Sequence, residues 1–133
     1  MSIHRHKKAL QEIWKSFKRM FVKNRLVPYT TALSVLFLSI TFALPVWRLL
    51  PLAEQSPFIA LHYNIYLGVD RFGPVYQVFF LPGVGIFFLL LNLFIQARAY
   101  KNQKMLSLFF ASATPLLEFI LCAAMVLIVL TNI

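Results

Sequence analysis

Residues 106–130 read LSLFFASATPLLEFILCAAMVLIVL, an apolar stretch whose single charge is Glu118. At a rise of about 1.5 Å per residue, a helix of this length crosses a hydrocarbon core of roughly 30 Å. Two more stretches of this kind come earlier in the chain, at residues 28–47 and 76–97. The sequence therefore predicts a transmembrane domain of three helices over residues 27–133.

The composition leads to the same fold class. The chain has 133 residues, of which 60% are hydrophobic and 13% are charged, whereas soluble domains carry about 25% charged residues. A water-soluble fold of this length cannot bury so much apolar surface. We therefore expect an all-α integral membrane protein. Its one cysteine, Cys122, lies inside an apolar span and is interpreted as a packing residue.

The positive charges predict the orientation. Eight of the 13 Lys and Arg residues lie in residues 1–25 and three lie in residues 98–104, while the loop at 48–75 holds only Arg48 and Arg71. Because basic residues beside spans mark the cytoplasmic side, we expect a multi-pass protein of the cell (inner) membrane. Its N-terminus should be cytoplasmic and its C-terminus outside. The same placement argues against nucleic acid as a partner.

Residues 1–26 predict a basic amphipathic helix. Apolar residues from Leu10 to Phe21 recur at spacings of three and four, and Trp14 and Phe17 share their face. We expect this helix to lie on anionic lipids, although a loosely folded basic tail remains the alternative. The basic region is too long for a cleavable signal peptide, and His4 and His6 alone predict no metal site. The membrane-surface residues are Lys7, Lys8, Lys15, Lys18, Arg19, Lys23 and Arg25.

The outer loop at 48–75 contains an alternating segment. Apolar and polar side chains alternate over residues 61–70, which predicts an extended segment, with a helix as the alternative. Residues 71–74 predict a turn. The unpaired edge of a strand invites pairing, either within a hairpin or with another chain. The residues that we expect to interact there are His62, Tyr63, Asn64, Asp70 and Arg71.

The loop does not predict an active site. His62 and Asp70 suit acid–base chemistry, but no nucleophile-elbow, metal-ligand or phosphate-loop spacing accompanies them. We therefore expect no catalytic residue, metal or cofactor.

Residues 62–74, HYNIYLGVDRFGP, carry a pattern of HYN followed by G, D and GP. The stretch resembles a segment of small uncharacterised three-helix membrane proteins of reduced-genome bacteria. That resemblance implies a membrane location and a similar architecture, and no catalysis. The pattern falls on His62, Tyr63, Asn64, Gly68, Asp70, Gly73 and Pro74.

Polar residues within the spans fall into two layers when depth is counted from each cytoplasmic edge, at roughly 9–10 Å and 20 Å. Glu118 belongs to the deeper layer, where an ionised carboxylate is costly. We expect it to be neutral at pH 7, to face a helix interface, and to bond Thr41, a backbone carbonyl or a second copy's Glu118. A proton-accepting or cation-binding role is the alternative. The intramembrane polar residues are Glu118, Thr41, Asn92, Ser34 and Ser112.

Together these features predict a non-enzymatic integral membrane subunit, or an assembly or scaffold protein, that acts in an oligomer or larger complex of the plasma membrane. Its partners should be the lipid bilayer, with anionic lipids at the N-terminal helix, and its own copies or other membrane subunits. A small proton or ion pathway formed by several protomers around Glu118 is the second hypothesis. A membrane enzyme using His62 and Asp70 is the third.

Overall fold

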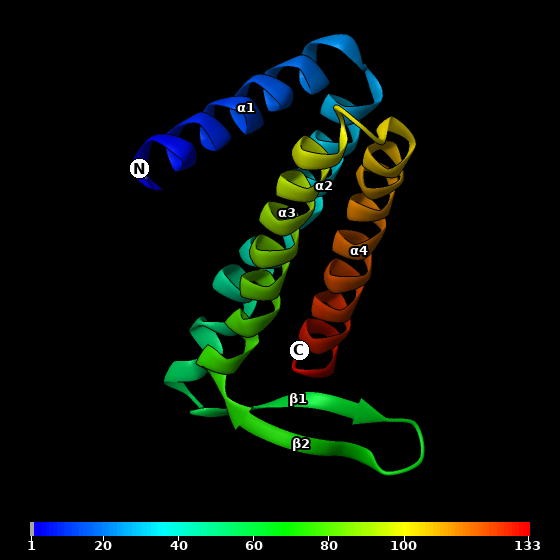
Figure 1. Cartoon of the computed structure of the whole chain (residues 1–133). Coiled ribbons are helices and arrows are strands. Elements are labelled where there is room, and N and C mark those ends of the chain that lie inside the picture. Colours follow the sequence, from blue (N-terminus) through cyan, green and yellow to red (C-terminus); the bar gives the residue numbers. More distant parts are fainter. Residues whose placement is uncertain (1) are drawn as a thin grey trace. The chain divides into compact units, whose positions relative to one another are not determined.

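The computed structural model describes residues 2–133, with side chains from residue 7 onward except residue 9. Over these residues the chain is mostly helical, as predicted, and contains one small sheet (Figure 1). The elements in chain order are α1 (Ser2–Lys23), α2 (Leu26–Leu44), η1 (Pro45–Leu49), η2 (Pro51–Glu54), β1 (Phe58–Asn64), β2 (Gly68–Pro74), η3 (Val75–Phe79), α3 (Phe80–Ala99) and α4 (Lys104–Thr131).

Among the described residues, three helical stretches are long and apolar enough to cross a membrane, namely Leu26–Glu54, Val75–Ala99 and Lys104–Thr131. They contain the three predicted spans and confirm that part of the prediction. Within the most apolar window of each stretch, only 22%, 28% and 33% of the residues are buried inside the chain. Most of the helix surface is therefore left for lipid or for another protein.

The first helical stretch is longer than predicted. Its α-helix ends at Leu44 because Pro45 has no N–H to donate to the next hydrogen bond of the helix. The chain nevertheless keeps coiling through a π-helical turn, closed by a 2.9 Å hydrogen bond from Leu50 N to Pro45 O, and then through η2. The first residues of the predicted loop at 48–75 are therefore helical turns, which reach residue 54.

The outer connection is a β-hairpin. β1 and β2 pair antiparallel, which confirms the extended conformation but corrects its extent, because residues 65–67 form a turn. Residues 71–74, predicted as a turn, belong to β2. The actual turn is stabilised by Asn64, whose Oδ1 accepts the Tyr66 N–H at 2.9 Å, and by Gly68 at φ +74°.

Two register shifts flank His62. Ala60 pairs with Phe72, His62 with Arg71 and Tyr63 with Val69, so that each strand holds one extra residue. Such bulges bend a strand and redirect its side chains. A simple alternation of the sequence could not predict them.

The chain divides into two compact units, each with its own core. The first comprises Met1–Ser34 and Phe88–Leu116, and the second comprises Val35–Phe87 and Leu117–Ile133. The first core contains Met20, Val27, Tyr100 and Ala111. The second contains Leu49, Ile59, Val75, Val78, Met125 and Val129.

In the first unit, α1 is attached to the end of α3. Ser16 Oγ donates to the Ala97 carbonyl at 2.6 Å, and Met20 is fully buried. Leu10 and Trp14, on the same apolar face, stay 65% and 59% exposed. The predicted helix is confirmed over residues 2–23, but only part of its apolar face is free for lipid.

All seven basic residues predicted for the membrane surface are exposed, whereas the side chains of His4 and His6 lie outside the described set.

Candidate functional site

The buried residues of α4 follow one helical face. They recur mostly at spacings of three and four, so that one face of α4 is covered by other residues of the chain. Its polar members are enclosed with the apolar ones, which is the arrangement expected for polar groups within a membrane span. The buried positions are Ser107, Ala111, Thr114, Pro115, Glu118, Cys122, Met125 and Val129.

In the first unit, Asn92 has a partner that the sequence analysis missed. Its Nδ2 donates to Thr114 Oγ1 at 3.1 Å, and both side chains are buried. Ser112, which was predicted among the intramembrane polar residues, is exposed and donates to Leu108 O of its own helix. The signal that could have identified Thr114 is its position four residues before Glu118, on the same helical face. Ser34 is buried and donates to Thr30 O at 2.8 Å.

Glu118 faces the interior of the second unit, as predicted, and its side chain is 0% exposed. Neither carboxyl oxygen has a hydrogen-bond partner among the described residues. The space for the carboxyl group is provided by Gly85, since a Cβ there would lie 2.8 Å from Glu118 Oε2 and 2.8 Å from Leu38 Cδ1. The glycine therefore accommodates the acid.

The predicted hydrogen bond between Thr41 and Glu118 is not formed. Thr41 is buried, but its Oγ1 donates to Phe37 O at 2.8 Å, within its own helix. A helical threonine readily satisfies its hydroxyl in this way. Because Glu118 is enclosed against Gly85 of the same chain, it is also not positioned to meet a second copy's Glu118.

A cavity of about 920 Å³ lies in the second unit. The hairpin contributes His62, Asp70 and Arg71 to its lining, while α3 and α4 contribute Leu81 and Ile128. Three of the five predicted outer-loop residues thus come together here. The other two do not line it: Tyr63 is 59% exposed, and Asn64 holds the turn.

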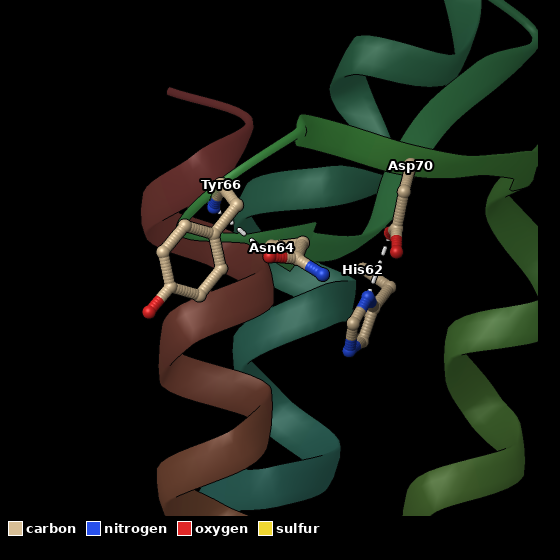
Figure 2. A network of polar contacts seen from close by, with 4 residues as sticks. All are labelled: His62, Asn64, Tyr66 and Asp70. Atoms are coloured by element: carbon tan, nitrogen blue, oxygen red, sulfur yellow. Dashed lines mark hydrogen bonds and ion pairs between the residues drawn. The ribbon is translucent and has the colours of Figure 1, made fainter.

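His62 and Asp70 form a pair across the hairpin. His62 Nδ1 lies 2.7 Å from Asp70 Oδ1, and Figure 2 shows both side chains on one side of the strands. Since a carboxylate only accepts, Nδ1 is assigned as the donor. Such a pair can orient an imidazole for acid–base work. However, the described lining of this cavity contains no serine, threonine, cysteine or lysine that could act as a nucleophile.

Asn132 is a structural residue that the sequence analysis did not single out. Its Oδ1 accepts the Ala60 N–H and its Nδ2 donates to the Ala60 carbonyl, both at 2.8 Å. The side-chain amide of Asn132 therefore satisfies both backbone groups of Ala60 on the open edge of β1, in the way that a neighbouring strand would. The position of an asparagine just after an apolar helix does not indicate this role.

Among the described side chains, which begin at residue 7 and leave out residue 9, no three of His, Cys, Asp or Glu gather closely enough to hold a metal ion. No protein-family model, curated protein or solved structure matches the chain.

Proposed function

We propose that the protein is a non-catalytic subunit of a membrane complex and that its outer hairpin binds a neighbouring chain. The observation that carries this proposal is the hairpin tip, where Ile65, Tyr66 and Leu67 are 81%, 92% and 76% exposed. Clusters of exposed apolar side chains of this kind are typical of binding surfaces.

The backbone of the hairpin supports the same role. Asn132 is hydrogen-bonded to the N–H and C=O of Ala60 on the open edge of β1. Within the described residues, β2 has no further strand beside it. An open strand edge next to an apolar tip offers both hydrogen bonds and contact area to a partner.

Site-specific photo-crosslinking tests this proposal. A photoreactive amino acid in place of Tyr66 should give a defined adduct in the membrane, and the mass of the intact complex then identifies a second copy or another subunit. Tyr29 is the matched control because it is an aromatic residue that is 74% exposed but lies outside the hairpin. Equal crosslinking at both positions, or no adduct at position 66, would contradict the proposal.

A proton or ion pathway is the second hypothesis. It is favoured by the complete burial of Glu118 without a hydrogen-bond partner among the described residues. If this hypothesis holds, protein reconstituted in liposomes should dissipate a pH gradient, and Glu118→Gln should abolish the flux. An unchanged flux in that variant would contradict a pathway that depends on Glu118.

A further inference from the structure

The cavity beneath the hairpin has the size and the lining of a ligand site. Its volume of about 920 Å³ lies within the range of roughly 300–1,000 Å³ that is usual for small-molecule sites. The helices contribute apolar side chains, namely Val78, Phe80, Leu81 and Ile128. The polar groups come mainly from the hairpin. A ligand that fills this cavity must therefore be amphipathic.

A second hollow of about 410 Å³ shares its lining with the first at four residues, Leu61, His62, Leu81 and Ile128. It adds further apolar side chains from α4, Ala124 and Leu127. Two apolar hollows that share one boundary suit a molecule with two hydrocarbon chains better than a molecule with one.

The position of the cavity also points to lipid. Its lining residues come from the last part of α4 and the first part of α3, next to the hairpin (Figure 1). Tyr76 and Phe80, both 72% exposed, lie at this end of the span. Aromatic side chains at the ends of spans are typical of the headgroup level of a bilayer.

One charged side chain of the lining, Arg71, is left without a partner among the described residues and can meet a headgroup. Asp70 accepts the hydrogen bond of His62 (Figure 2), and Arg71 has no ion-pair partner among the described residues. The guanidinium donors of Arg71 are therefore open at the cavity. Arginine binds phosphate through a pair of parallel hydrogen bonds, which makes a phosphate-bearing anion the matching group.

We propose that this cavity binds one anionic phospholipid, with its phosphate at Arg71 and its two acyl chains against the residues shared by the hollows. The site is independent of a partner at the hairpin tip, because the exposed tip residues 65–67 do not line either hollow. The lipid would fill the space between the hairpin and the helix ends that the chain leaves open.

Native mass spectrometry of the full-length protein in delipidated micelles tests the proposal. Phosphatidylglycerol and phosphatidylcholine with the same acyl chains are added separately. Wild-type protein should bind one phosphatidylglycerol per chain at least tenfold more tightly than phosphatidylcholine. Arg71→Gln should weaken phosphatidylglycerol binding about tenfold, as expected for the loss of a charge-assisted contact. It should weaken phosphatidylcholine binding less, because the choline cation of that lipid already offsets the charge of its phosphate.

Arg48→Gln is the matched control. Arg48 stacks over the Trp47 ring at 4.3 Å and lines neither hollow, so its removal should leave both lipids unaffected. A second variant, Leu81→Trp, fills the boundary shared by the two hollows and should weaken both lipids.

Three outcomes would overturn the proposal. They are equal binding of the two lipids to wild-type protein, losses of the same size in Arg48→Gln and Arg71→Gln, and unchanged lipid binding in Leu81→Trp. A circular dichroism spectrum and a monodisperse elution profile for each variant separate loss of binding from loss of fold.

Discussion

At the residue scale, Glu118 shows what the sequence can and cannot predict. Its depth in an apolar span predicts that it faces an interface, and it is 0% exposed. The predicted partner was wrong, because Thr41 donates its hydroxyl proton to Phe37 O of its own helix and not to Glu118. A local hydrogen bond within a helix competes with any bond across helices, and sequence spacing does not show which forms.

The enclosure of Glu118 makes Gly85 sensitive to substitution. Gly85→Ala should lower the free energy of unfolding by about 1–3 kcal/mol, the cost of overpacking, because the new methyl meets Glu118 and Leu38. Gly83→Ala is the control, since a Cβ there has nothing within 4 Å and alanine is the better helix former. It should change stability by less than about 1 kcal/mol, in the favourable direction. Unfolding in one detergent compares the variants.

The effects of substitutions at Gly85 and Glu118 on stability should also be coupled. In a Glu118→Ala background the cost of Gly85→Ala should fall by at least about 0.5 kcal/mol, because one of the two clashing groups is gone. Strict additivity of the two substitutions would show that the carboxyl does not rest on Gly85.

At the scale of elements, the periodicity of α1 predicts its helix and its apolar face. It does not predict which residues of that face pack against the protein and which stay exposed. Phe17 packs with the core of the first unit, while Trp14 on the same face is 59% exposed. Apolar residues at helical spacing look the same whether they meet protein or lipid. This division of the face appears only once α2, the connection at Tyr100 and α4 supply the residues that pack with Met20 and Phe17.

This division predicts different effects for two neighbouring substitutions. Trp14→Glu should change stability by less than about 0.5 kcal/mol, as for most surface sites, but should remove α1 from lipid. Phe17→Glu should cost about 1–3 kcal/mol because it places a charge against the core. A nitroxide on Leu10→Cys, in a Cys122→Ala background, reports lipid contact in anionic nanodiscs. Loss of stability in Trp14→Glu equal to that in Phe17→Glu would argue against the division.

The hairpin depends on a residue far away in the sequence. Asn132→Ala removes two hydrogen bonds to the Ala60 backbone, and each such bond contributes about 0.5–1.5 kcal/mol. We expect exchange of the Ala60 amide hydrogen to accelerate about tenfold or more, with the helices unaffected. Asn102→Ala, at an exposed side chain in the connection between α3 and α4, should leave this amide unchanged. Unaltered exchange in Asn132→Ala would show that the hairpin is held by other contacts.

At the scale of the whole molecule, hydrophobicity and length were sufficient to predict three spans, because the need to satisfy every backbone group in lipid leaves helices as the simplest solution. The hairpin pairing was beyond the sequence, since Gly68 and the bulges around His62 depend on local geometry. The lining of the outer cavity was likewise unpredictable, because Ile128 meets the hairpin only after the chain has folded.

The orientation remains a prediction from the distribution of lysine and arginine. Single cysteines at Tyr66, which is 92% exposed, and at Lys101, which is also exposed, test it in a Cys122→Ala background. In intact cells an impermeant maleimide should label position 66 and should reach position 101 only after lysis. The reverse pattern would invert the topology and would place the lipid cavity at the cytoplasmic surface.

The attachment of α1 has a consequence for its behaviour in different electrolytes. The Glu12–Lys101 ion pair, at 3.6 Å, joins side chains that are 60% and 67% exposed, and such pairs contribute little and are screened by salt. The buried contacts of Met20 are apolar and do not weaken with ionic strength. The attraction that we predict between the exposed lysines and anionic headgroups should weaken, because the Debye length falls to about 3 Å at 1 M salt. Concentrated sodium chloride should therefore release α1 from lipid while leaving it docked on the protein.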